Sequence, residues 1–63
     1  MPIIHVHLLR GRSLSQKRAL VEKMTSAVCE AIGVDTQAVL ILLHECESED
    51  IAKAGLLFLD SRG

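Results

Sequence analysis

A proline at the second position is the residue of this chain best suited to acid–base chemistry. If Met1 is removed, Pro2 carries a free secondary amine at the start of a strand. A free α-amino group titrates at about pH 8, and loss of solvent or a nearby cation lowers its pKa towards neutrality. Proton transfer needs a base with a pKa near the working pH. The plain alternative is that Pro2 only opens the strand, where proline loses no ladder hydrogen bond.

Two arginines, Arg10 and Arg12, bracket Gly11 and could bind an anion. A guanidinium fork matches a carboxylate bidentately, so an arginine near a base can position an acid substrate. An isolated arginine in a turn is otherwise a solvated residue. Arg10 could add a second positive charge at the mouth of such a site.

Histidines and cysteines are the other residues that could do chemistry. His5 and His7 share one face of a predicted strand, and His44 follows a second strand. A His-x-His pair can supply two zinc ligands, but a zinc site needs a third or fourth, and the cysteines are distant from this pair in sequence. We therefore expect no metal site and interpret the histidines as polar interface residues. Cys29 and Cys46 are interpreted as packing residues.

A strand and a helix must position these side chains. Residues 3–9 alternate, and Ile4, Val6 and Leu8 form an apolar face that we expect against the helix. The opposite face is mixed and could meet another subunit. Ser13 and Gln16 fit a capping box, so the helix is predicted to begin at residue 14 and to end at residue 32, before Gly33.

The residue pattern in the second half of the chain predicts another strand and a C-terminal tail. Residues 38–43 are apolar without alternation, which is typical of a parallel strand covered on both faces. Residues 45–50 are predicted to form an acidic, irregular loop. Residues 54–60 form a short apolar piece, which we expect to pack on a neighbouring subunit as a strand or hairpin.

Length and composition favour a single domain, residues 1–63, that assembles with other chains. A 63-residue chain is marginal as a lone globule, yet 49% of its residues are hydrophobic. Two cysteines and no visible secretory leader make a disulfide framework a poor expectation, so we expect a cytoplasmic protein. A net charge of −1 without a basic run excludes nucleic-acid and membrane-surface binding, and no apolar segment is long enough to span a membrane.

The order of these features resembles the 4-oxalocrotonate tautomerase family. The resemblance rests on Pro2 opening a strand, on the Gly-Arg-Ser turn at residues 11–13 and on the Gln-Lys pair at residues 16–17. It implies an α/β (α+β) fold with one β-α-β unit and a C-terminal strand or hairpin. Two such units would join into a four-stranded sheet covered by two helices, and three of these dimers would form a homo-hexamer.

The resemblance also implies a cofactor-independent isomerase. The Pro2 nitrogen would move a proton on a 2-hydroxydienoate or enol acid to give the 2-oxo isomer, while Arg12 would hold the carboxylate of this small substrate. Relatives of the best-known activity carry a second arginine where this chain has Leu40, and an aromatic residue where it has Ile51. Both positions would line the substrate pocket, and the loss of the arginine makes efficient turnover of a dicarboxylate doubtful.

Three alternatives stay open at this point. The same proline serves hydration, dehalogenation or decarboxylation in other relatives, although extra arginines or an acid are usually needed. A non-catalytic or partner-dependent subunit would keep the assembly and lose the site, which Leu40 favours and which Pro2 and Arg12 oppose. A metal-binding or structural oligomer using His5 and His7 is the weakest of the three.

Overall fold

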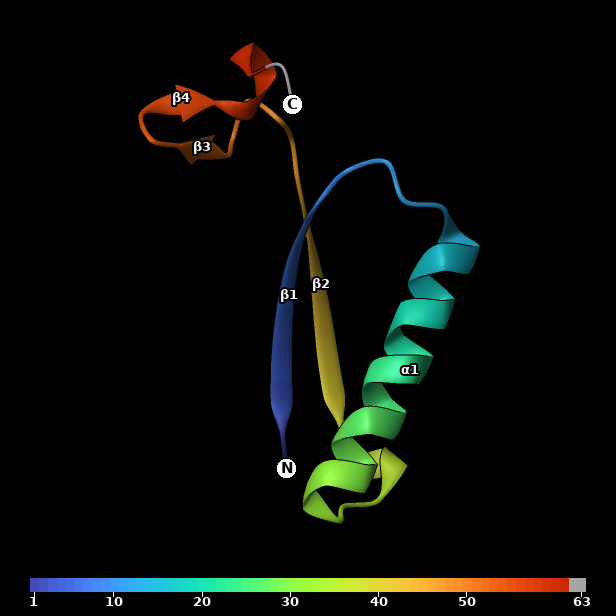
Figure 1. Cartoon of the computed structure of the whole chain (residues 1–63). Coiled ribbons are helices and arrows are strands. Elements are labelled where there is room, and N and C mark those ends of the chain that lie inside the picture. The colour runs from blue at the N-terminus through green and yellow to red at the C-terminus, as the bar shows by residue number, and fades with distance from the viewer. Residues whose placement is uncertain (62–63) are drawn as a thin grey trace.

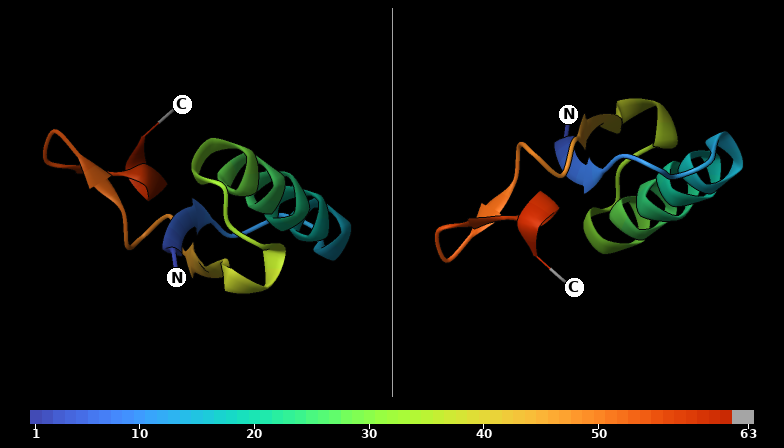
Figure 2. Two further views of the ribbon diagram at one scale, coloured as in Figure 1. Left: turned by 90° about the horizontal axis from the view of Figure 1, so that it is seen from below. Right: turned by 90° about the horizontal axis from the view of Figure 1, so that it is seen from above.

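Two parallel strands and one crossing helix make up most of the chain in this computed structural model, which describes residues 1–61 (Figure 1). The strands pair in register from Ile3 beside Leu40 to Leu9 beside Cys46, and the helix lies across one face of the pair (Figure 2). The elements, in chain order, are β1 (Ile3–Leu9), α1 (Leu14–Ile32), a 3₁₀ turn (Thr36–Ala38), β2 (Leu40–Cys46), β3 (Ala52–Lys53), β4 (Leu56–Leu57) and a second 3₁₀ turn (Phe58–Asp60). The predicted β-α-β unit is therefore confirmed.

Helix α1 begins and ends where the sequence predicts, because both ends are capped. The Ser13 hydroxyl accepts a hydrogen bond from the backbone N–H of Gln16, and the Gln16 side chain accepts one from the N–H of Ser13. At the other end Gly33 adopts φ 71°, and its N–H donates to the carbonyl of Cys29 at 2.9 Å. Across residues 1–61, no helix combines the length and apolarity needed to cross a bilayer.

Alternation along the two strands decides which side chains meet the helix. Ile4, Val6 and Leu8 of β1 are half-buried, as expected of the face packed under α1. The odd-numbered residues Ile3, His5 and His7 are exposed on the other face, together with Leu40, Leu42 and His44 of β2. We call this second surface the open sheet face; it consists of Ile3, His5, His7, Leu40, Leu42 and His44.

The second strand corrects two of the predicted boundaries. It begins at Leu40 rather than at residue 38, because Asp35 caps a 3₁₀ turn and accepts a hydrogen bond from the N–H of Ala38 at 2.9 Å. It also continues to Cys46, so Glu45 and Cys46 are not in a loop. The cause is the length of β1, whose last residues pair with them. The N–H of Arg10 then extends this pairing by donating to the carbonyl of Cys46 at 2.9 Å.

The predicted tail is a small hairpin that extends from the strands on the side away from α1 (Figure 2). Strands β3 and β4 pair antiparallel around a two-residue loop, in which Ala54 has φ 54° and Gly55 has φ 81°. Two positive φ angles in a two-residue loop are typical of a type I′ turn. The N–H of Phe58 donates to the carbonyl of Ile51 at 2.8 Å and extends the hairpin pairing, and the N–H of Leu59 donates to the carbonyl of Ser48 at 3.0 Å, two residues after β2 ends.

Within residues 1–61, no side chain is buried by the chain itself. The accessible surface is 4967 Å², whereas a folded monomer of this size exposes about 4,000 Å². The radius of gyration is 14.7 Å, against an expected value of about 11 Å for a compact domain. The predicted coverage of β2 on both faces is wrong for a single chain, because Leu40 and Leu42 remain 44% and 38% exposed. The isolated chain lacks a closed core.

Candidate active site

Pro2 lies immediately before β1, at the end of the sheet where β2 also begins. Its carbonyl accepts a hydrogen bond from the N–H of Leu40 at 3.1 Å, so the position of the ring is fixed by the ladder. Pro2 is half-buried, whereas Met1 is 84% exposed. While Met1 is attached, the Pro2 nitrogen is a tertiary amide without basicity. Removal of Met1 would leave a secondary amine directly beside Leu40.

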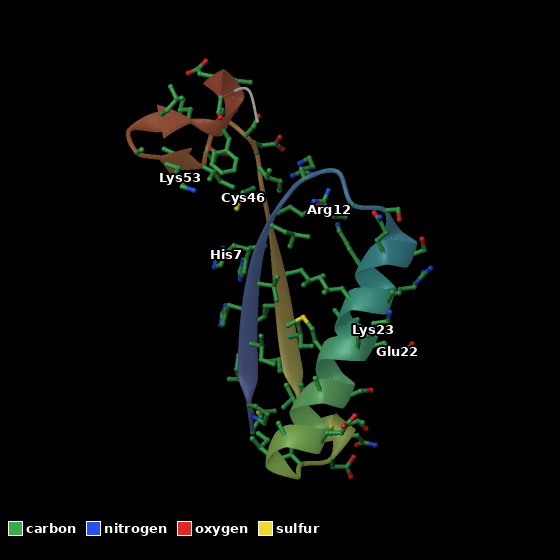
Figure 3. The ribbon with its side chains drawn as sticks, viewed as in Figure 1. His7, Arg12, Glu22, Lys23, Cys46 and Lys53 are labelled. Carbon is green, nitrogen blue, oxygen red and sulfur yellow. The ribbon has the colours of Figure 1, made fainter. Side chains whose placement is uncertain are left out.

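Arg12 lies at the other end of the sheet, in the connection between β1 and α1 (Figure 3). The seven residues of β1 separate it from Pro2. At about 3.3 Å per residue, that strand spans roughly 23 Å, which is too far for a small acid to touch both residues of one chain. The structure therefore does not bring the two main predicted site residues together within a single chain.

Ile51 belongs with Arg12 rather than with Pro2. It follows β2, so it lies at the carboxyl end of the two strands, and it is half-buried where the hairpin joins the sheet. The predicted site residues thus fall into two groups. Pro2 and Leu40 lie at one end of the sheet, and Arg10, Arg12 and Ile51 lie at the other. A site that contains all of them needs one end of one chain against the opposite end of another.

Arg10 is paired with two carboxylates. It is therefore not the free positive charge that the sequence suggested for the mouth of the site. Its Nε atom donates to Glu47 Oε1, and its Nη1 atom lies 3.5 Å from Glu45 Oε1. The hydrogen bond with Glu47, followed by the charges of both glutamates, raises the pKa of Arg10 above its ordinary value. Arg10 therefore stays charged, but its charge is largely compensated.

Glu45 connects the start of the helix to the end of β2. Its second oxygen, Oε2, accepts from Lys17 Nζ at 2.9 Å, and the hydrogen bond from Lys17 lowers the pKa of Glu45. The sequence predicted an acidic, irregular loop for both glutamates and gave no indication that Lys17 would contact either of them. No local sequence signal indicates the position of Glu45, because it depends on the parallel register, which pairs Leu8 with Glu45 and puts this carboxylate on the face under α1.

The three histidines gather on the open sheet face, as their positions on the two strands require. His5 Nδ1 lies 3.2 Å from His44 Nε2, and the His7 and His44 rings stack with centroids 4.8 Å apart. Figure 3 shows His7 directed away from α1. Among residues 1–61, no group of three or more histidine, cysteine or acidic side chains is arranged to hold a metal ion. The rings stack instead of converging on one point.

A hollow also lies beside the hairpin, but it contains none of the predicted site residues. It is lined by Lys53, Ala54, Leu56, Phe58 and Ser61. The apolar side chains Leu56 and Phe58 are 50% and 37% exposed there. This surface has the character of a contact region and lacks a convergent set of catalytic groups.

The fold and the two separated groups define a small β-α-β subunit whose predicted site residues lie too far apart to meet within one chain. Comparison with known proteins agrees with this class. The family model described as "Tautomerase enzyme" matches residues 2–60. The chain is 38% identical to the 2-hydroxymuconate tautomerase of Comamonas testosteroni over 56 residues, which cover 89% of each protein. It is 40% identical to the 2-hydroxymuconate tautomerase of Bacillus subtilis over 55 residues, covering 87% of this chain and 89% of that protein.

Solved structures give the same result for the fold. The crystal structure of YwhB, a homologue of 4-oxalocrotonate tautomerase, superposes with a TM-score of 0.93 at 36% identity, covering 97% of this chain and all of that one. The chain belongs to the tautomerase family, in the branch of the 4-oxalocrotonate tautomerases. Membership supports isomerase activity of the tautomerase type, and the expected family and fold are both confirmed.

Proposed function

We propose that this chain is a subunit of a cofactor-independent tautomerase in which Pro2, freed of Met1, is the general base. The observation that carries the proposal is the family match, which begins at Pro2 and extends to residue 60. The hydrogen bond between the Pro2 carbonyl and the Leu40 N–H supports it further, because it fixes the ring that holds the base. A base held in position loses little freedom when the substrate binds.

The reaction would move one proton within an enol acid. The Pro2 nitrogen takes the hydroxyl proton of a 2-hydroxydienoate, and the resulting dienolate carries its negative charge over oxygen and carbon. The protonated nitrogen then returns the proton to a carbon atom and gives the 2-oxo isomer. No electron or group is exchanged with another molecule, so the residues of the chain suffice for the chemistry.

Arg12 of a second chain would hold the substrate carboxylate. Its guanidinium can bind the acid bidentately and orient the enol over Pro2. Leu40, next to Pro2, and Ile51, on the side of Arg12, would form apolar walls that exclude water and keep the amine neutral. Arg10 would lie at the mouth and add charge only as far as Glu45 and Glu47 leave it uncompensated.

The assembly we propose is a homo-hexamer, built as a trimer of dimers. Two observations support the joining of chains: no side chain among residues 1–61 is buried, and the site residues lie at opposite ends of the sheet. Both the open sheet face and the hairpin expose apolar side chains that neighbouring chains would cover. The hexamer itself follows from the resemblance to the family.

Leu40 favours one further candidate, a non-catalytic or partner-dependent subunit of the same fold. A leucine cannot bind a carboxylate or polarise a carbonyl, whereas relatives of the best-known activity have an arginine there.

If the chain is catalytic, the missing arginine should change its substrate preference. Loss of one preorganised donor typically costs about a hundred- to a thousandfold in kcat. We therefore propose weak activity on a dicarboxylic 2-hydroxydienoate and relatively better activity on a monocarboxylic enol.

The decisive experiment compares Met1-free wild type with Pro2→Ala, Arg12→Ala and Leu40→Arg on both substrate types. The intact mass of the purified chain first establishes whether Met1 is absent. Arg12→Ala should lower kcat/KM by roughly ten- to a hundredfold, the worth of a lost charged hydrogen bond. Leu40→Arg should raise the dicarboxylate rate more than the monocarboxylate rate. If wild type turns over neither substrate faster than Pro2→Ala, the non-catalytic candidate is correct.

A further inference from the structure

Three basic side chains surround the connection between β1 and α1, and two of them are already paired. Arg10 contacts Glu47 and Glu45, and Lys17 contacts Glu45. Within residues 1–61, no ion pair or side-chain hydrogen bond joins Arg12 to another residue. The two paired cations are balanced by two carboxylates, so Arg12 is the remaining charge available to an anion.

The pairing also fixes where Arg10 lies. Its N–H bonds to the carbonyl of Cys46, and its guanidinium bonds to Glu47, one residue further along the chain. Both the backbone and the side chain of Arg10 are therefore attached to the end of β2. Gly11, with φ 125°, separates it from Arg12, which continues towards α1.

The carboxylates differ in how firmly they are themselves held. Glu45 is 23% exposed and uses both oxygens, one towards Arg10 and one towards Lys17. Glu47 is 48% exposed and contacts Arg10 alone among the basic residues described. The pKa of Arg10 is raised chiefly by its hydrogen bond with Glu47. Glu47 is therefore the carboxylate whose removal would loosen the Arg10 guanidinium most, leaving it only the longer contact with Glu45 at 3.5 Å.

We propose that Glu47, assisted by Glu45, is a specificity-determining residue that holds Arg10 out of the anion site. The site then presents a single free guanidinium, Arg12, and takes acids with one carboxylate in preference to two. This inference rests on the proposed role of Arg12 in binding the substrate carboxylate. Leu40 is one proposed cause of a preference for monocarboxylates. Glu47 would be a second cause, and it lies at the opposite end of the sheet.

The test uses binding of unreactive acids, so that it does not depend on turnover. Hexanoate and adipate have the same chain length and carry one and two carboxylates. Their dissociation constants are measured by titration calorimetry at about 0.15 M ionic strength, where long-range charge effects are screened. Assembled, Met1-free wild type is compared with Glu47→Gln and with the double variant Arg10→Gln/Glu47→Gln. Glu49→Gln is the matched control, because it removes the same charge two residues away.

Glu47→Gln should bind adipate about two- to fivefold more tightly than wild type, the range of one exposed ion pair, and hexanoate by less than twofold. The double variant should return the adipate affinity to the wild-type value, because it removes the released arginine. A merely structural role for Glu47 would weaken binding of both acids. Glu49→Gln should change both affinities equally and by less than twofold.

Two results would overturn the inference alone. One is an adipate gain no larger in Glu47→Gln than in Glu49→Gln, and the other is a gain that persists in the double variant. Arg12→Gln separates these from a failure of the proposed function, because it should abolish hexanoate binding. Unchanged hexanoate binding in Arg12→Gln removes Arg12 from the site, and a wild type that binds neither acid overturns both proposals.

Discussion

Replacing Leu42 by lysine tests whether the open sheet face is covered by other chains. Ile3, Leu40 and Leu42 are 54%, 44% and 38% exposed on this face. Their exposed surface together equals that of somewhat more than one fully exposed side chain. Burying one apolar side chain is worth about 1.5–3 kcal/mol, so covering these three contributes about 2–4 kcal/mol per chain. Leu42 lies beside His5 in the ladder, and this face contains no carboxylate that could pair with a lysine.

Leu42→Lys should therefore dissociate the assembly. The substitution removes the contribution of Leu42 to the free energy of association, about 0.5–1 kcal/mol. Burying the unpaired ammonium adds a desolvation cost of several kcal/mol. A loss of about 3 kcal/mol per chain weakens association by more than about a hundredfold. Sedimentation velocity between about 0.1 and 100 μM measures the effect, and circular dichroism at the same concentrations measures helix content.

The control is Ser26→Lys, which adds the same charge on the exposed side of α1. It should sediment like wild type at every concentration. Two results would refute the reasoning: a folded wild-type monomer at micromolar concentration, or equal sedimentation of Leu42→Lys and Ser26→Lys. Either one means that the open sheet face stays in contact with water.

Three further predictions concern the supports of the site, all measured as urea unfolding at one chain concentration. Gly33→Ala should destabilise by roughly 1–2 kcal/mol, because alanine is strained at φ 71°. Ser13→Ala should cost about 1 kcal/mol by removing half of the capping box, and Ser13→Asp should restore most of it. Glu45→Gln should be less stable than wild type at pH 7. That difference should fade as the pH falls through the pKa of Glu45 in the folded chain, because a carboxyl with a lowered pKa stabilises the fold only while it is ionised. A difference that persists well below that pKa would contradict the ion pair with Lys17.

Most of the fold was predictable because the residues that start and end the helix act through local contacts. Ser13 and Gly33 satisfy the helix ends with neighbouring atoms, so the sequence alone places both boundaries. The boundaries of β2 were not predictable in this way. Its end depends on pairing with β1, about forty residues earlier in the chain, and polar residues such as Glu45 enter the ladder because their partners are already extended.

The candidate site was predictable as separate residues but not as a constellation. Pro2 could be placed at the start of the first strand and Arg12 in the turn before the helix, and both lie there in the structure. Their meeting depends on contact between chains, which periodicity and capping within one chain cannot describe. The pairing of Arg10 with Glu47 was missed for a related reason, because residues 37 positions apart become neighbours only when both strands end at the same edge.

The hairpin loop bears on how far the site can change. Ala54 is held at φ 54°, a conformation that costs a residue with a Cβ roughly 1–2 kcal/mol and that glycine or asparagine adopts more readily. Proteins remain close to the lowest stability that selection accepts, so a change that alters activity often needs compensation elsewhere. Ala54→Gly would supply such compensation from outside the proposed site. A lineage that acquired it first could then accept a costly change such as Leu40→Arg. Relieving the strain in this turn would therefore add stability that could offset a destabilising substitution at the opposite end of the molecule.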